Sequence, residues 1–272
     1  RPELEYVIRD SGATVVIADP HYESTVQSIA KDMKLRFVSI SELATKFSGY
    51  LPTIDASRNA MILYTSGTTK RPKGVLTTHI NIESQVAALI TAWGWSKDDH
   101  ILNVLPLHHV HGIINVVTCS LWAGALCEMM DRFDAKQTWH AFERLDVTLF
   151  MAVPTIYSKL ITEWEAATEN AQKLLSKACS NMRLMISGSA ALPTQILSKW
   201  RSITGHTLLE RYGMTETGMI LSNPLNGSRV PGHVGCPLDG VEVRLVNDQG
   251  MPVERGSEGE LEIKGPGVFK EY

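Results

Sequence analysis

Residues 60–76 have the sequence AMILYTSGTTKRPKGVL, an apolar run followed by a polar loop and a second apolar run. The first run, residues 60–64, predicts a buried strand. The loop gathers hydroxyls, glycines and cations, which are the groups that bind phosphate oxygens. It lacks the spacing of a Walker A loop, and Pro72 followed by the apolar run predicts a return to a strand. Phosphate binding and a solvated hairpin tip are both consistent with this composition.

Strand and helix patterns alternate on both sides of this loop. Such an order predicts an α/β fold with a mainly parallel sheet covered by helices. We expect further strands at residues 14–18, 36–40, 101–105, 125–130, 148–151 and 183–186. We expect helices at residues 22–33, 81–93, 112–122, 135–145, 154–166 and 193–203.

The pattern changes after about residue 222, where glycine, proline and short alternating segments prevail. Residues 241–246 and 260–264 alternate apolar and polar side chains, which is typical of strands with one covered face. We therefore predict an α/β part in residues 1–222 and a small β subdomain in residues 223–272. Residues 165–173 are polar and rich in alanine, and we expect a surface connection there.

The composition excludes several classes of partner. The chain has 272 residues with 26 basic and 29 acidic side chains, and this near-neutral balance excludes nucleic acid as the main partner. Residues 101–127 contain no charged side chain, but proline, asparagine and histidine divide them into pieces shorter than the roughly 20 residues of a membrane span. The four cysteines are too widely spaced for a zinc site or a redox pair, and they fit a reducing compartment.

The ends of the chain indicate a fragment. Arg1 lies in a strand-and-helix pattern that is already under way, and residues 265–272 end without a helix cap or a tail. We expect the chain to be part of a longer protein.

Several segments resemble the signature motifs of the adenylate-forming family, which includes acyl-CoA synthetases, luciferases and peptide-synthetase adenylation domains. Residues 64–74 resemble its phosphate-loop signature, and residues 211–216, RYGMTE, resemble its Tyr-Gly-x-Thr-Glu motif. Further resemblances, in the family's order, are found at residues 105–112, 153–157, 187–193 and 259–266. The resemblance implies the α/β fold of the family's large N-terminal domain, with the mobile C-terminal lid domain outside this chain.

The resemblance also implies an ATP site. The phosphate loop would wrap the β and γ phosphates with Thr65, Ser66, Gly67, Thr68, Thr69 and Lys73. Thr215 would donate to the α-phosphate, and Glu216 with Thr65 would hold Mg²⁺. The candidate catalytic residues are thus Thr65, Lys73, Thr215 and Glu216. Taken alone, Glu216 would instead be an acidic residue in the first turn of a helix.

Adenine would lie against the small residues Gly188, Ser189 and Ala190 and stack on Tyr212. Glu210 and Gly213 complete the implied ATP-binding set, although Tyr212 by itself would be interpreted as a core aromatic. Lys70 departs from the family, which usually has glycine or serine there, and we expect a working loop with changed nucleotide affinity.

Within the family, residues 205–216 and 109–112 most resemble malonyl-CoA synthetases, some of which are mitochondrial. A dicarboxylate needs its unreacting carboxylate neutralised, which the planar fork of an arginine does best. The resemblance implies a substrate site of His109, Lys159, Ser189, Arg211 and Met214. The alternative to a ligand role for Arg211 is a surface or inter-strand salt bridge, for example with Glu210. We interpret His108 and His111 as packing histidines, and Arg183 as a solvated strand start or a third cation.

The resemblance therefore implies that the full-length protein activates a carboxylic acid with ATP to an acyl-AMP and then to an acyl-CoA, using Mg²⁺ and CoA. Malonate is the expected acid, methylmalonate a second candidate, and the mitochondrial matrix the expected location, with the cytoplasm as the alternative. A medium-chain or aryl-acid CoA ligase is an alternative. A peptide-synthetase domain is disfavoured, because its amino-acid-binding Asp has no counterpart in this sequence. The alternative of another class is a noncatalytic nucleotide-binding module, because the family's ribose-binding Asp and C-terminal catalytic Lys have no match in these residues. We expect the fragment to be inactive alone.

Overall fold

The computed structural model describes residues 1–43, 49–66 and 71–272. These residues form two compact units. One unit comprises residues 1–77 and 270–272, and the other comprises residues 78–269. The proposed division of the chain at residue 222 stays a prediction.

The first unit contains two small sheets. Its elements are α1 (Pro2–Asp10), β1 (Val15–Ala18), α2 (Glu23–Asp32), β2 (Arg36–Ser39), the 3₁₀-helix η1 (Ile40–Glu42), β3 (Asn59–Thr65) and β4 (Lys73–Thr78). Strands β1 and β2 pair in parallel, and β3 pairs with β4. Leu76 in β4 also bridges Glu271, so residues 270–272 run antiparallel beside β4.

The return of residues 73–78 to a strand is confirmed, but the predicted burial of residues 60–64 is wrong. The side chain of Ile62 is 37% exposed. A sheet of only two main strands offers too few neighbours to cover both faces of β3.

The second unit is built on a seven-stranded sheet. Its strands are β5 (His100–Asn103), β6 (Leu126–Met129), β7 (Leu149–Ala152), β8 (Leu184–Ser187), β9 (Leu209–Met214), β10 (Gly218–Ser222) and β11 (Cys236–Pro237). A separate hairpin is formed by β12 (Glu242–Val246) and β13 (Glu260–Lys264). The helices are α3 (His79–Trp93), η2 (His111–Thr118), α4 (Cys119–Ala123), α5 (Ala135–Glu143), α6 (Pro154–Ala166), α7 (Glu169–Ala178), η3 (Cys179–Asn181) and α8 (Thr194–Thr204).

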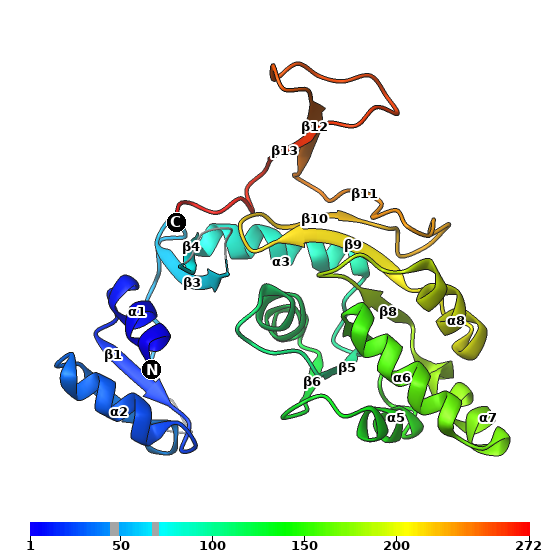
Figure 1. Cartoon of the computed structure of the whole chain (residues 1–272), viewed down its shortest axis with the longest axis horizontal. Helices are drawn as coiled ribbons and strands as arrows, with labels where there is room; N and C mark the ends of the chain where they lie inside the picture. Colours follow the sequence, from blue (N-terminus) through cyan, green and yellow to red (C-terminus); the bar gives the residue numbers. More distant parts are fainter. Residues whose placement is uncertain (44–48, 67–70) are drawn as a thin grey trace. The chain divides into compact units, whose positions relative to one another are not determined.

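The large sheet has the order β11-β10-β9-β8-β7-β5-β6, and its five strands from β9 to β6 are parallel. The prediction of a mainly parallel sheet is confirmed. Because crossovers between parallel strands are right-handed, connections that run in opposite directions along the sheet place their helices on opposite faces. Accordingly, α3, η2 and α4 pack together on one face, and α5 to α8 pack together on the other (Figure 1).

Aromatic side chains fill the core under α5 to α8. Trp139 stacks on Trp200 with ring centroids 5.7 Å apart, and Tyr157 meets Trp200 edge-on at 5.0 Å. The Tyr157 hydroxyl donates to the carbonyl of Ile186 in β8 (2.9 Å). These contacts fix α6 and α8 against the strands whose ends carry the candidate site.

Two helical segments differ from the prediction. The expected surface connection at residues 165–173 is wrong, because α7 begins at Glu169 with Thr168 as its N-cap. The helix expected at residues 112–122 begins as a π-helix, η2, before α4. Such wide helical turns are rare and are frequently found at functional sites.

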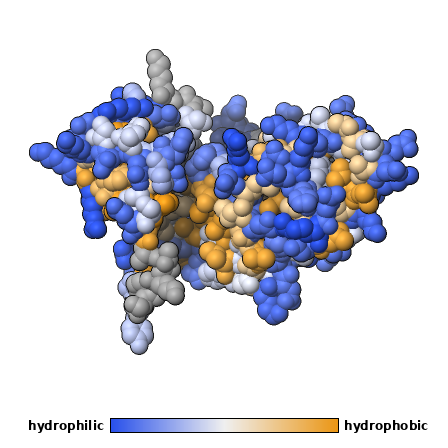
Figure 2. All heavy atoms as spheres, turned by 90° about the horizontal axis from the view of Figure 1, so that it is seen from below, coloured by the Kyte–Doolittle hydropathy of each residue, from blue (hydrophilic) through white to orange (hydrophobic). Residues whose placement is uncertain are grey.

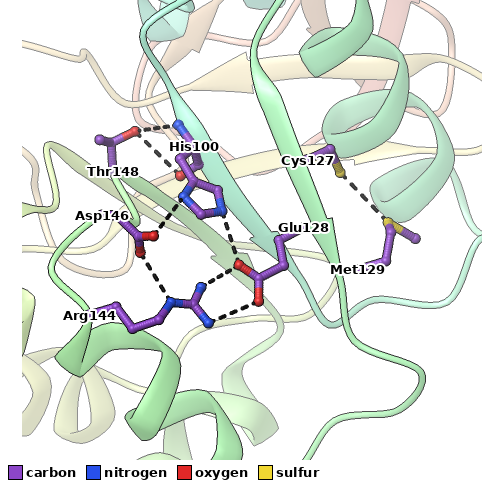
Figure 3. Close-up of polar contacts among 7 residues, drawn as sticks. All are labelled: His100, Cys127, Glu128, Met129, Arg144, Asp146 and Thr148. Carbon is purple, nitrogen blue, oxygen red and sulfur yellow. Dashed lines mark hydrogen bonds and ion pairs between the residues drawn. The ribbon is translucent and has the colours of Figure 1, made fainter.

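An ion-pair network surrounds His100, the first residue of β5 (Figure 3). His100 lies between Glu128 (3.1 Å) and Asp146 (3.7 Å), and the guanidinium of Arg144 contacts both carboxylates. The backbone N–H of His100 donates to the hydroxyl of Thr148 (2.9 Å). The network joins β5 and β6 to the turn before β7.

The surface mixes hydrophilic and apolar areas on the face drawn in Figure 2. Leu121 and Trp122 in α4 and Leu126 in β6 are among the exposed apolar side chains. Within the described parts of the chain, every helix is too short or too polar to cross a membrane.

Candidate active site

The carboxyl ends of β5, β7, β8 and β9 point to one edge of the large sheet. The connection after β5 leads to β6, which lies on one side of β5 at the edge of the sheet. The connections after β7 lead to β8 and then β9, which lie on the other side. Open α/β sheets bind ligands in the crevice at such a switch point. The loops at residues 104–110, 188–193 and 215–217 start at this edge, and together with β9 they carry all the predicted site residues of this unit except Lys159.

A set of polar side chains lies beside this edge, and all but Ser189 are buried. We call His111, Asn115, Ser187, Ser189 and Arg211 the polar cluster. Four of its members each have a buried atom without a hydrogen-bond partner in the part of the chain that the structure describes: Nε2 of His111, Nδ2 of Asn115, Oγ of Ser187 and Nε of Arg211. Because buried polar atoms are nearly always paired, such a concentration indicates a place where a ligand supplies the partners.

Arg211 in β9 is the only charged member of the polar cluster, and it is 3% exposed. Burial lowers the pKa of its guanidinium to about 10, so it stays charged near neutral pH. No carboxylate of residues 1–43, 49–66 or 71–272 forms an ion pair with it, and Glu210 instead accepts a bond from the N–H of Gly232 (3.1 Å). The described residues therefore do not support the alternative interpretation, in which Arg211 forms a structural salt bridge.

Ser189 connects Arg211 with His111. Its hydroxyl lies 3.5 Å from Nη2 of Arg211, which donates, and 3.2 Å from Nδ1 of His111. Ser189 adopts a φ of 65°, a left-handed conformation that costs a residue with a side chain about 1–2 kcal/mol. Strain of this kind is concentrated at functional sites.

His111 is the site residue that the sequence did not reveal. We interpreted it as a satisfied packing histidine, but its Nε2 has no partner among the described residues although the side chain is buried. Burial, then the charges of Arg211 and His109, lower the pKa of His111 well below its ordinary value, so the imidazole is neutral. Asn115, one turn further along η2, accepts a bond from Gln85 (3.3 Å) and was also missed. The available signal was the pair of polar residues four apart in an otherwise apolar stretch.

A pocket of about 310 Å³ is lined in part by the polar cluster, through Ser187, Ser189 and Arg211. Its walls include Ser189, Ala190, Glu210, Tyr212 and Gly213, all from the predicted ATP-binding set. Burial raises the pKa of Glu210, although the bond from Gly232 opposes this shift. The ring of Tyr212 is 38% exposed, so it is not a core aromatic and offers an open face. A volume of this size is within the range of small-molecule sites.

The motif at residues 214–216 forms the turn between the antiparallel strands β9 and β10. Glu216 is thus not in the first turn of a helix, which was the alternative interpretation. Its carbonyl accepts the N–H of Phe269 (2.7 Å), and Thr217 N–H donates to the carbonyl of Met214 (3.3 Å). The turn places Thr215 and Glu216 just beyond the carboxyl end of β9, where Met214 ends the strand.

The phosphate loop belongs to the other compact unit. Thr65 ends β3, Ser66 follows it, and Lys73 begins β4. Gly67, Thr68, Thr69 and Lys70 lie outside the described residues.

His109, Lys159 and Arg183 each contact a side chain outside the polar cluster. The ring of His109 lies against that of His108, with the centroids 4.3 Å apart and the ring planes tilted by 52°. The ammonium of Lys159 lies 5.9 Å from the ring centroid of Phe133. Arg183 forms a two-pronged ion pair with the buried Asp99, so it is not available as a third cation. Its side chain is 32% exposed, in agreement with a solvated strand start. The roles of His109 and Lys159 stay predictions.

Comparisons with known proteins agree with this geometry. The family model described as AMP-binding enzyme matches residues 1–272. The chain is 47% identical to the mitochondrial malonate–CoA ligase ACSF3 of Xenopus laevis over 99% of its length and 53% of the relative's, and 38% identical to a malonate–CoA ligase of Arabidopsis thaliana over 99% and 48%. It therefore spans about half the length of these relatives.

Solved structures give the same result. ATP-bound MatB from Rhodopseudomonas palustris has a TM-score of 0.87 and 34% identity, covering 99% of this chain and 54% of that one. A malonyl-CoA ligase in a product complex with methylmalonyl-CoA and AMP has a TM-score of 0.87 and 33% identity, covering 99% and 56%. These chains share the adenylate-forming fold, and the predicted fold class is confirmed.

Proposed function

Because the chain belongs to the family of AMP-binding enzymes, we propose that the full-length protein is an AMP-forming acid–CoA ligase that activates malonate, with methylmalonate as a second substrate. The observation that carries this proposal is the buried guanidinium of Arg211, which has no carboxylate partner among the described residues. The names of the curated relatives and of the ligase with bound methylmalonyl-CoA support it.

A dicarboxylate satisfies the polar cluster in a way that an apolar acid does not. The unreacting carboxylate would accept hydrogen bonds from Arg211, including its unpaired Nε. The Nε2–H of neutral His111 would supply a further donor in this assignment, because its Nδ1 then accepts the hydroxyl proton of Ser189 (3.2 Å). An alkyl or aryl tail would leave these buried groups unpaired, which costs about 1–3 kcal/mol for each group. This difference disfavours the medium-chain and aryl-acid alternatives.

The reaction proposed here has two steps. A carboxylate oxygen of malonate bonds to the α-phosphorus of ATP, the bond to the bridging oxygen breaks, and pyrophosphate leaves. The sulfur of CoA then bonds to the acyl carbon, its proton is lost to solvent, and AMP leaves with the electron pair of the broken C–O bond. Charge accumulates on phosphate oxygens in the first step, so fixed cations and donors lower its barrier.

We assign the ATP contacts as the sequence predicts. Lys73 with the hydroxyls and amides of the phosphate loop would bind the β and γ phosphates, and Thr215 the α-phosphate. Adenine would occupy the 310 Å³ pocket between Tyr212 and the small residues after β8. This placement is supported by the pocket's walls, which come from the predicted set.

A magnesium ion would neutralise charge on the triphosphate, and Glu216 with Thr65 would hold it. Magnesium bound to a triphosphate usually takes only one or two protein carboxylates, and the turn after β9 carries one. The donor set fits, since one carboxylate and one hydroxyl are hard oxygen ligands of the kind that a nucleotide-bound magnesium ion takes.

We also propose the mitochondrial matrix as the location, since the relative from Xenopus laevis is named as mitochondrial. The proposed domain division, residues 1–222 and 223–272 followed by a lid domain, is supported by the distinct β12–β13 hairpin.

Pyrophosphate exchange by the full-length protein tests the proposal. We expect exchange with malonate to be well above exchange with acetate or octanoate. Equal rates with all three acids would remove the dicarboxylate assignment and leave adenylation intact. Nucleotide binding without exchange or thioester formation with any acid would favour the noncatalytic module.

A further inference from the structure

The lysine at the end of the phosphate loop lies over an aromatic ring. The ammonium nitrogen of Lys73 is 4.7 Å from the ring centroid of Tyr272. Two backbone hydrogen bonds hold the segment that carries this ring beside β4, from Leu76 N–H to the carbonyl of Glu271 (2.9 Å) and from Lys270 N–H to the carbonyl of Leu76 (3.0 Å). The ring is therefore fixed to the strand that Lys73 begins.

A second tyrosine binds the same end of the loop. The guanidinium carbon of Arg71 is 5.6 Å from the ring centroid of Tyr6, and the Tyr6 hydroxyl donates to the carbonyl of Pro72 (3.0 Å). Tyr64 packs edge-on against Tyr6, with centroids 6.5 Å apart, and donates to Asp10 (2.7 Å). The backbone just before Lys73 is thus anchored to α1.

We propose that Tyr272 is a positioning residue for the ammonium of Lys73, on a loop end that Tyr6 anchors. The inference rests on the proposed function, because that function assigns Lys73 to the triphosphate. Tyr272 acts through Lys73 and does not itself contact the reacting atoms.

An aromatic ring is better suited than a carboxylate to positioning the ammonium of Lys73. A lysine side chain has up to about 2 kcal/mol of rotamer entropy to lose when a phosphate fixes it. A ring in contact restricts those rotamers in advance, and a cation–π contact at an exposed site is worth only about 0.5–1 kcal/mol. The ammonium keeps its full charge for the phosphates, whereas an ion pair with Asp or Glu would compete with them.

Equilibrium binding of a fluorescent ATP analogue to the full-length protein tests the inference without relying on turnover. We expect Tyr272→Ala and Tyr272→Leu to weaken nucleotide affinity about two- to fivefold, the equivalent of the contact energy, while Tyr272→Phe stays within the error of the parent. The Leu variant keeps apolar volume but lacks the π face. The KM for ATP should rise in the same proportion, and the KM for malonate should not change.

A double-mutant cycle separates positioning from a general structural effect. In a Lys73→Gln background, Tyr272→Ala should cause no further loss of affinity. Tyr22→Ala is the matched control, because Tyr22 is 60% exposed and Tyr272 is 61% exposed, and no cation of the described residues lies over the ring of Tyr22. This control should bind as the parent does.

Unchanged affinity in both Tyr272→Ala and Tyr272→Leu would overturn the inference, and so would an equal loss with and without Lys73. These results are distinct from a failure of the proposed function. If the parent activates no acid but its ATP affinity depends on Tyr272 through Lys73, the inference stands and the ligase assignment falls.

Discussion

The guanidinium of Arg211 lies directly against the backbone of Gly188. A Cβ added to Gly188 would stand 2.5 Å from both Cζ and Nε of Arg211, closer than carbon and nitrogen atoms can approach. Gly188 follows β8 and Arg211 is in β9, so the bare backbone of one strand end makes room for the cation of the next. The absence of a side chain at residue 188 thus determines where the guanidinium lies.

Gly188→Ala should displace the guanidinium and impair malonate recognition. The methyl group meets the far end of a flexible side chain, so the fold should persist while the charge-assisted bonds to the carboxylate are lost. We expect the KM for malonate to rise about ten- to a hundredfold, with a smaller change for ATP. Steady-state kinetics with each substrate varied would check this, and an unchanged KM for malonate would show that the position of Arg211 is unimportant.

Arg211→Ala should raise the KM for malonate far more than the KM for ATP. The substitution removes the cation that we assign to the second carboxylate, a loss of about 2 kcal/mol or more. Arg211→Lys keeps the charge without the fork and should fall between the parent and the Ala variant. Parallel increases in both KM values would instead place Arg211 in the ATP site.

Arg211→Met should stabilise the protein in the absence of ligands. A buried cation without a carboxylate partner is costly, and replacing buried charge by an apolar side chain of similar volume often stabilises proteins by about 1–4 kcal/mol. Chemical denaturation of the unliganded variant would measure the change in the free energy of unfolding. A clear loss of stability would indicate a structural partner for Arg211.

His111 should make the protein less stable in acid. Burial, Arg211 and His109 lower the pKa of His111 in the folded state, so below about pH 6.5 the unfolded chain binds a proton that the folded chain does not. Stability should therefore fall as the pH falls below that value, by about 1.4 kcal/mol per pH unit from this one group.

Comparison of the parent with His111→Asn isolates this contribution. Denaturation at pH 7.5 and pH 5.5 should show a smaller decrease in the free energy of unfolding for the variant. His140→Asn is a suitable control, because His140 has 83% of its side chain exposed. An identical pH dependence of the parent and His111→Asn would contradict the burial of a neutral His111.

Asp99→Asn should destabilise the fold without a direct effect on the substrate site. Burial opposes ionisation of Asp99, yet Arg183 holds the pKa of this carboxyl below its usual range with bonds of 2.6 and 2.7 Å. Removing one partner of a buried pair costs about 3–5 kcal/mol. Asp98→Asn, at a neighbouring pair with both side chains 78% exposed, should change the free energy of unfolding by less than about 0.5 kcal/mol.

The sequence predicted the regular elements where local signals were strong. Helix α6 and strand β13 have the predicted bounds, because Pro154 begins the helix and residues 260–264 alternate strictly. Helix α7 was missed because its composition is polar, with Leu174 62% exposed. Its stability comes from the Thr168 cap and from packing against α5 and α6, which a local pattern does not reveal.

The same contrast between local signals and long-range contacts explains which site residues could be predicted. Arg211 could be proposed from its motif and from the need of a dicarboxylate for a cation. His111 could not be distinguished from a packing histidine, because its contact with Ser189 joins residues 78 positions apart in the chain. Only the folded arrangement shows that Nε2 of His111 lacks a partner among the described residues while Arg211 lies nearby.

The most direct measurement is a crystal structure of the full-length protein with a nonhydrolysable malonyl-adenylate analogue. We expect the free carboxylate of the analogue to lie within hydrogen-bond distance of Nε of Arg211 and Nε2 of His111, with adenine in the pocket beside Tyr212. A free carboxylate directed to solvent, with Arg211 paired to a carboxylate of the protein, would contradict it.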